Sequence, residues 1–91
     1  MRDVDFSKWL KKEKEYSVKS TSDALSRCRR IERTFAVSLD KTLSSESGFE
    51  RLRERVSNEA ERLVGKDKNK LYTARGAHRL ALKRYFEFLR A

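Results

Sequence analysis

The sequence predicts an all-α fold built from four helices in a single domain that spans residues 1–91. The chain has no proline and only three glycines, so few residues interrupt a helix. Apolar residues recur at steps of three and four along most of the chain, which is the helical period. Because so short a chain buries only a little over about 60 % of its unfolded surface, we expect one compact core.

The first helix is expected from about Asp5 to Lys14. Phe6, Trp9 and Leu10 lie at i, i+3 and i+4 and form a short apolar stripe, so we place all three in the core. Acidic residues at the start of this segment and lysines toward its end complement the helix dipole.

Ser17 or Ser20 is expected to cap a second helix that begins at Val18. One side of this helix is apolar and the opposite side is basic, which is the pattern of an amphipathic surface helix. The apolar side carries Val18, Thr21, Ala24, Leu25, Cys28, Ile31 and Phe35. The polar side carries Ser22, Ser26, Arg29, Arg30 and Arg33.

Residues 36–48 are less regular and predict a short helical turn followed by a loop. Ser47 and Glu50 have the spacing of a capping box, so a third helix is expected to start at Gly48. Gly65 is its expected end, because glycine enters the left-handed conformation without strain. The core stripe of this helix is Phe49, Leu52, Val56, Ala60, Leu63 and Val64. Its polar face mixes arginine with glutamate, which is typical of solvated surface.

A polar linker over residues 66–70 leads into a last helix that begins at about Lys70. Its expected core stripe is Ala74, Ala77, His78, Ala81, Tyr85, Phe88 and Leu89. Gly76 is unfavourable inside a helix and would be tolerated if another backbone approached closely there. Arg75, Arg79 and Lys83 follow one line along the other flank, at i, i+4 and i+8.

The excess positive charge lies in two separate segments. Of the net charge of +9, residues 66–91 contribute +6 and residues 16–35 contribute +3. If the helices of these segments pack together they can form one basic face, which indicates a polyanionic partner; the alternative is an ordinary solvated surface. The candidate DNA-binding residues are Arg27, Arg29, Arg30, Arg33, Lys68, Lys70, Arg75, Arg79 and Lys83.

No group of residues predicts catalysis, a metal site or a cofactor. A nucleophile needs a neighbouring base and zinc needs three or four ligands, whereas cysteine and histidine each occur once. Cys28 and Tyr85 are expected to pack in the core, and His78 at its edge or against DNA. One cysteine, no secretory signal and no apolar run of membrane-spanning length favour the cytoplasm and no membrane partner.

Several motifs occur together in the order of a known domain. They are FSKWL at residues 6–10, SVKS at 17–20, SRCRRI at 26–31 and AHRLALKRYFEFL at 77–89. This pattern resembles the N-terminal core-binding domain of tyrosine recombinases and phage integrases. Ser20 stands where that family usually has threonine, Ala77 where it often has tyrosine, and residues 36–65 match poorly.

The resemblance implies a four-helix orthogonal SAM-like bundle that grips duplex DNA, with its second and fourth helices facing the major groove. The family's catalytic domain, with its arginine, histidine and nucleophilic tyrosine, has no counterpart in these residues. We therefore expect a DNA-binding domain that is not an enzyme.

The alternative is a protein-interaction or homodimerisation module. Some apolar residues of the last helix exceed what one core stripe needs, and such a surface can pair with a second copy, a catalytic domain or another partner chain. These residues are Leu71, Leu80, Leu82 and Phe86.

Overall fold

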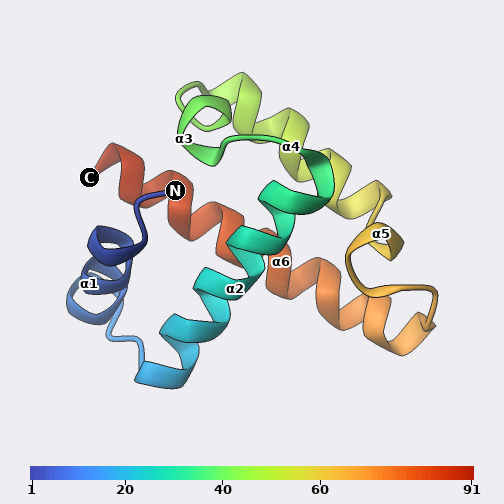
Figure 1. Ribbon diagram of the computed structural model, residues 1–91, viewed down its shortest axis with the longest axis horizontal. Helices are drawn as coiled ribbons and strands as arrows, with labels where there is room; N and C mark the ends of the chain where they lie inside the picture. Colours follow the sequence, from blue (N-terminus) through green and yellow to red (C-terminus); the bar gives the residue numbers. More distant parts are fainter.

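The fold is all-α, as predicted, and the computed structural model describes residues 1–91 (Figure 1). Four longer helices account for most of the chain. A single-turn helix precedes the third of these in the sequence, and another follows it. The elements are α1 (Asp3–Glu13), α2 (Val18–Phe35), α3 (Leu39–Thr42), α4 (Glu46–Asn58), α5 (Glu61–Val64) and α6 (Lys68–Arg90). None of the helices combines the length and apolar character needed to cross a bilayer.

The last helix is the centre of the arrangement. α6 contacts α1, α2, α4 and α5, and its largest interface is with α2, which crosses it near the middle of both helices (Figure 1). α1 lies beside the C-terminal half of α6, and α5 lies beside its first turns. The apolar stripe of α6 is therefore covered from several sides.

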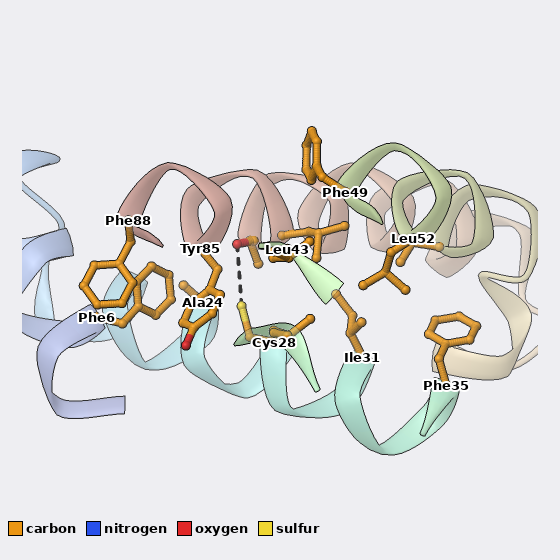
Figure 2. Close-up of a cluster of buried hydrophobic side chains, with 14 of the residues drawn as sticks. Phe6, Ala24, Cys28, Ile31, Phe35, Leu43, Phe49, Leu52, Tyr85 and Phe88 are labelled. Atoms are coloured by element: carbon orange, nitrogen blue, oxygen red, sulfur yellow. Dashed lines mark hydrogen bonds between the residues drawn. The ribbon is translucent and has the colours of Figure 1, made fainter. Parts of the chain in front are cut away.

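Small side chains lie where α2 crosses α6. Ala24 and Cys28 of α2 lie in the buried core on the side of this helix that faces α6 (Figure 2), and Ala81 of α6 belongs to the same core. The Cys28 Sγ atom lies 3.5 Å from the Ala81 carbonyl oxygen, so this side chain contacts the backbone of the other helix directly. Burial raises the pKa of the Cys28 thiol to about 12, and the residue serves as a small apolar group.

Aromatic rings close the end of the core beneath α1. The Phe6 ring centre lies 4.9 Å from that of Tyr85 and 5.4 Å from that of Phe88. Trp9 is half-buried beside them, with its ring centre 5.8 Å from that of Phe88. Phe6 and Leu10 are fully buried, as their spacing predicts.

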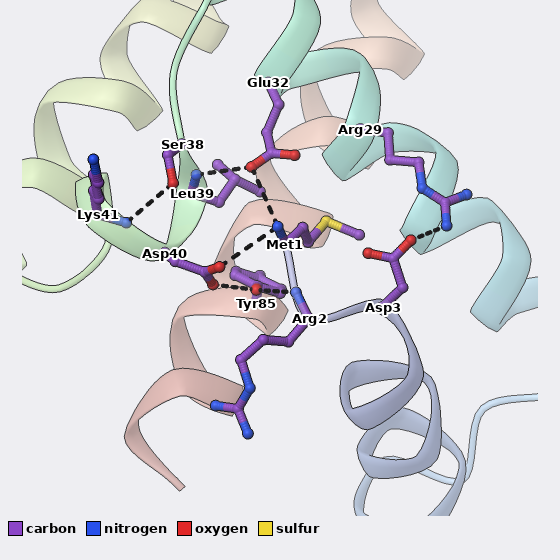
Figure 3. Close-up of polar contacts among 10 residues, drawn as sticks. All are labelled: Met1, Arg2, Asp3, Arg29, Glu32, Ser38, Leu39, Asp40, Lys41 and Tyr85. Atoms are coloured by element: carbon purple, nitrogen blue, oxygen red, sulfur yellow. Dashed lines mark hydrogen bonds and ion pairs between the residues drawn. The ribbon is translucent and has the colours of Figure 1, made fainter.

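Tertiary hydrogen bonds, rather than a capping side chain, fix the start of α1. The Arg2 backbone N–H donates to the Tyr85 hydroxyl oxygen at 2.9 Å, and this hydroxyl in turn donates to the Asp40 carboxylate (Figure 3). The Met1 ammonium lies 3.5 Å from the same carboxylate. These contacts explain why the helix begins at Asp3 and not at the predicted Asp5.

Two further helix starts, those of α4 and α6, also differ from the predicted ones. α4 is capped by Ser45, whose hydroxyl accepts the Gly48 N–H at 3.1 Å, so the capping box predicted at Ser47 is wrong. α6 begins at Lys68 because the Asp67 carboxylate accepts N–H groups of its first turn, which shortens the predicted linker. For α2, Ser17 is the cap.

The predicted third helix is divided into α4 and α5. Its backbone leaves helical geometry at Glu59 (φ −116°, ψ 30°). This turn brings α5 against α2, where the Arg62 guanidinium donates to the Thr34 carbonyl oxygen at 2.9 Å and lies over the Phe35 ring. A tertiary contact, which local spacing does not encode, determines the break.

Part of the apolar surplus of α6 lies inside the molecule. Leu82 is fully buried, and the Phe86 ring stacks on that of Phe49 with 4.3 Å between ring centres. Leu80 remains 45 % exposed. Val18, predicted to join the core, is 75 % exposed because it is the first residue of α2 and lies beyond the crossing.

The two helical glycines predict opposite effects of substitution by alanine. A Cβ at Gly48 would lie 2.0 Å from the Thr42 carbonyl oxygen, whereas a Cβ at Gly76 would meet nothing within 4 Å. The close backbone approach that would favour a glycine is thus absent at Gly76 and present at Gly48. We expect Gly48→Ala to lower the free energy of unfolding by at least about 2 kcal/mol. We expect Gly76→Ala to raise it by roughly 0.5–1 kcal/mol, because alanine is the better helix former.

Urea unfolding of both variants beside the parent chain measures these changes. Destabilisation by Gly76→Ala would contradict the open surroundings of that position.

Candidate nucleic-acid interface

Ion pairs neutralise most of the arginines of α4 and α5. Arg53 pairs with Glu50 at 2.7 Å, and Arg55 and Arg62 both pair with Glu59, at 3.2 and 2.8 Å. Hydrogen bonds from these two guanidinium groups lower the pKa of the Glu59 carboxyl. This side of the molecule therefore has little uncompensated positive charge, as the mixed polar face predicts.

The cations of α6 are different, because from Lys68 to Lys83 none has an acidic partner within 4.0 Å. Asp67 is the only acidic residue between Lys66 and Phe86, and its carboxylate is occupied in capping the helix. The unpaired cations of this segment are Lys68, Lys70, Arg75, Arg79 and Lys83.

A groove between α2 and α6 brings together three of the predicted residues. Arg27 and Arg30 line it from α2, and Lys70 lines it from the first turns of α6. Ala77 and His78 lie along its α6 side, and its volume is about 410 Å³. No aspartate or glutamate lines this groove.

Three further predicted residues lie outside this groove. Arg29 points to α1, where its guanidinium pairs with the Asp3 carboxylate (Figure 3). Arg33 on α2 and Lys68 at the start of α6 are exposed and do not line the groove. The periodicity of α2 explains the division: Arg27 and Arg30 flank Cys28 on the side of α6, whereas Arg29 lies across the helix.

The remaining predicted residues form a second basic area. Arg75 and Arg79 line a surface hollow of about 780 Å³ beside Ser57 and Asn58 at the end of α4. Lys83 is exposed and lies one helical turn beyond Arg79. The cations of α2 and α6 thus form two neighbouring areas, whereas the sequence allowed for a single basic face.

An exposed, uncharged strip lies between the two basic areas. Thr73, Gly76 and Leu80 lie at i, i+3 and i+7, so they follow one row along α6. Thr73 borders both the α2–α6 groove and the hollow beside α4. Helix α6 therefore presents an uncharged row with cations on both sides.

His78 is buried at the side of the α2–α6 groove, with 1 % of its surface exposed. Its Nδ1 atom lies 2.8 Å from the Ala74 carbonyl oxygen, which can only accept, so Nδ1 carries the proton. The Nε2 atom then has a free lone pair, and it faces the Arg30 guanidinium at 3.5 Å. Burial, together with the charges of Arg30 and Arg27, lowers the pKa of the imidazole despite the opposite effect of the Ala74 hydrogen bond.

Several polar residues that line the basic areas have no counterpart among the predicted residues, and Asn69 and Tyr72 are examples. Asn69 lines the α2–α6 groove, and Tyr72, with 83 % of its surface exposed, lines the hollow beside α4. Neither the charge nor the periodicity of these residues indicates that they lie beside the basic areas. The signal available in the sequence is position, since both lie within a turn of Lys70 or Arg75.

Comparison of this chain with protein-family models, with curated proteins and with solved structures finds no match.

The neutral, buried state of His78 predicts that acidification destabilises the fold. Above its ordinary pKa of 6.5 the imidazole is neutral in both folded and unfolded chains, so its contribution is complete there. Below that pH the unfolded chain takes up the proton more readily, so stability falls as the pH drops toward the lower pKa of the folded state. Urea unfolding between about pH 8 and about pH 5 measures this loss.

His78→Gln, which does not titrate, is the control and should flatten the pH dependence in that window. Equal pH profiles of the two proteins would show that His78 is not the group responsible.

Proposed function

We propose that this chain binds duplex DNA through α2 and α6 and carries out no chemistry of its own. The observation that carries the proposal is the separation of charges. Acidic residues neutralise most arginines of α4 and α5, whereas the cations of α6 from Lys68 to Lys83 stay unpaired. Unpaired, exposed cations gathered on one part of a surface favour a polyanionic partner.

The arrangement around α6 suits a helix lying in the major groove. That groove is about 12 Å wide, and a helix with its side chains measures about 10–12 Å across. The uncharged row of Thr73, Gly76 and Leu80 would face the base edges. The cations on either side would meet the phosphates of the two strands, which position a protein on DNA without reading its sequence.

The resemblance to recombinase core-binding domains supports the same assignment, since it implies a grip on DNA by the corresponding helices. We propose membership of that class on the motifs and on the order of the four longer helices. Catalysis is not part of the proposal.

A protein-interaction module remains the alternative function. This alternative is based on apolar residues of α6 beyond those that one core stripe needs. In the fold, however, Leu82 lies in the core and the Phe86 ring stacks on the Phe49 ring. The large apolar side chains that remain exposed are spread over three helices, with Val4 on α1, Val18 on α2, and Tyr72 and Leu80 on α6. DNA binding is the function with the stronger structural support.

Charge reversal at Arg75 and Arg79 should abolish retention on DNA while leaving the fold intact. Arg75→Glu with Arg79→Glu removes two contacts and adds repulsion, so we expect affinity for a random duplex to fall at least about 30-fold. The matched control is Lys8→Glu with Lys12→Glu on α1, where two exposed, unpaired lysines have the same i,i+4 spacing.

Fluorescence anisotropy at low salt measures both double variants, and circular dichroism verifies their helix content. An equal loss of affinity in the two variants would mean that only net charge matters. Unchanged retention of the α6 variant would overturn the proposed function.

The affinity of the parent chain for random duplex should depend steeply on salt. If about six phosphates are neutralised, the logarithm of the binding constant falls with that of the salt concentration with a slope of about −5. Replacing Arg27 by glutamine should make the slope less steep by about one unit. A slope near zero for the parent chain would exclude electrostatic capture.

A further inference from the structure

We infer that the groove between α2 and α6 seats one phosphate group, held by Arg27, Arg30 and Lys70, and that the buried His78 keeps Arg30 in position. The ligand is a tetrahedral oxyanion. The inference rests on the proposed function in taking this group to be a phosphate of the DNA backbone.

The composition of the groove suits such an anion. Three cations line it without any acidic residue, whereas the neighbouring grooves along α2 include Asp23 or Asp3. A guanidinium group and an ammonium group together supply both directional and non-directional contacts to an oxyanion. The groove is open to the surface rather than enclosed, so the phosphate can remain part of a nucleic-acid strand.

The contact between His78 and Arg30 gives the groove a fixed element. Because Nδ1 is committed to the Ala74 carbonyl oxygen, only the Nε2 lone pair can face Arg30. Arginine has five N–H donors, so one contact to the imidazole leaves the others for a ligand. A half-buried guanidinium held in this way loses less freedom on binding than a lysine on a free surface.

A second feature separates this groove from the hollow beside α4. Arg79 in that hollow donates to the Arg75 carbonyl oxygen on its own helix, and both arginines are exposed. Arg30, by contrast, meets a fully buried polar side chain from another helix. The α2–α6 groove is therefore the better ordered of the two basic areas.

The first experiment is a titration with sulfate that is monitored by NMR of the backbone amides and side chains. Sulfate keeps its double charge across the working pH range. We expect saturable shifts of the Arg30 and His78 signals. Arg30→Gln should weaken sulfate binding roughly tenfold, since a charge-assisted contact is lost. Lys12→Gln, a control at an exposed cation of α1 outside the groove, should leave it unchanged. Shifts that do not saturate, or that respond equally to both variants, would overturn the inference.

The positioning role of His78 is tested by two substitutions. His78→Leu fills the space without an acceptor and should weaken sulfate binding several-fold without lowering the melting temperature. His78→Gln supplies an amide oxygen near the position of Nε2 and should restore binding. A lower melting temperature with unchanged sulfate binding in His78→Leu would mean that the histidine has a structural role only.

A duplex-DNA titration of the same variants tests whether the bound phosphate belongs to the DNA backbone. This question is independent of whether the groove binds an oxyanion at all. Parallel losses of sulfate and DNA affinity in Arg30→Gln would support a backbone phosphate. If Arg30→Gln loses sulfate but binds DNA as the parent does, the assignment to the DNA backbone is overturned. If the parent binds sulfate in this groove but not DNA, the proposed function fails while the oxyanion site stands.

Discussion

The close crossing of α2 over α6 is the constraint on which the rest of the structure depends. Small residues make it possible, since Ala24, Cys28 and Ala81 all belong to the core and the Cys28 sulfur reaches the α6 backbone (Figure 2). Interiors pack at nearly crystalline density, so a larger group at the crossing would force the helices apart. The crossing also determines the groove, because Arg27 and Arg30 flank Cys28 and are carried with it to the side of His78.

Periodicity predicted the four longer helices and most of the core, because the apolar stripe of a helix must face the interior. It failed where a tertiary contact determines the local structure. At the start of α1, the Tyr85 hydroxyl oxygen accepts the Arg2 N–H in place of a capping side chain. Where the predicted third helix breaks, the Thr34 carbonyl oxygen accepts a hydrogen bond from the Arg62 guanidinium. Gly48 belongs to the same group, since its close neighbour lies on α3.

The candidate site could be predicted in part from the sequence. Charge counting located the two basic segments, but it could not tell Arg29, which pairs with Asp3 of α1, from Arg30, which meets His78. Adjacent residues on a helix point about 100° apart, so their partners depend on which helix packs on each side. That information comes only from the assembled fold, and so does the division of α6 cations into two areas.

Three local features lower the stability of helix α6, and the core requires none of them. Arg75, Arg79 and Lys83 repel one another at i,i+4 spacing, by roughly 0.2–0.5 kcal/mol per pair in isolated helices. Gly76 lowers helix stability although its surroundings have room for a side chain, and His78 is a polar group in the buried side of the helix. Local choices that oppose folding are expected where a surface serves a ligand. All three costs fall on the groove, the uncharged strip and the basic line beside it, which is the surface proposed to meet DNA.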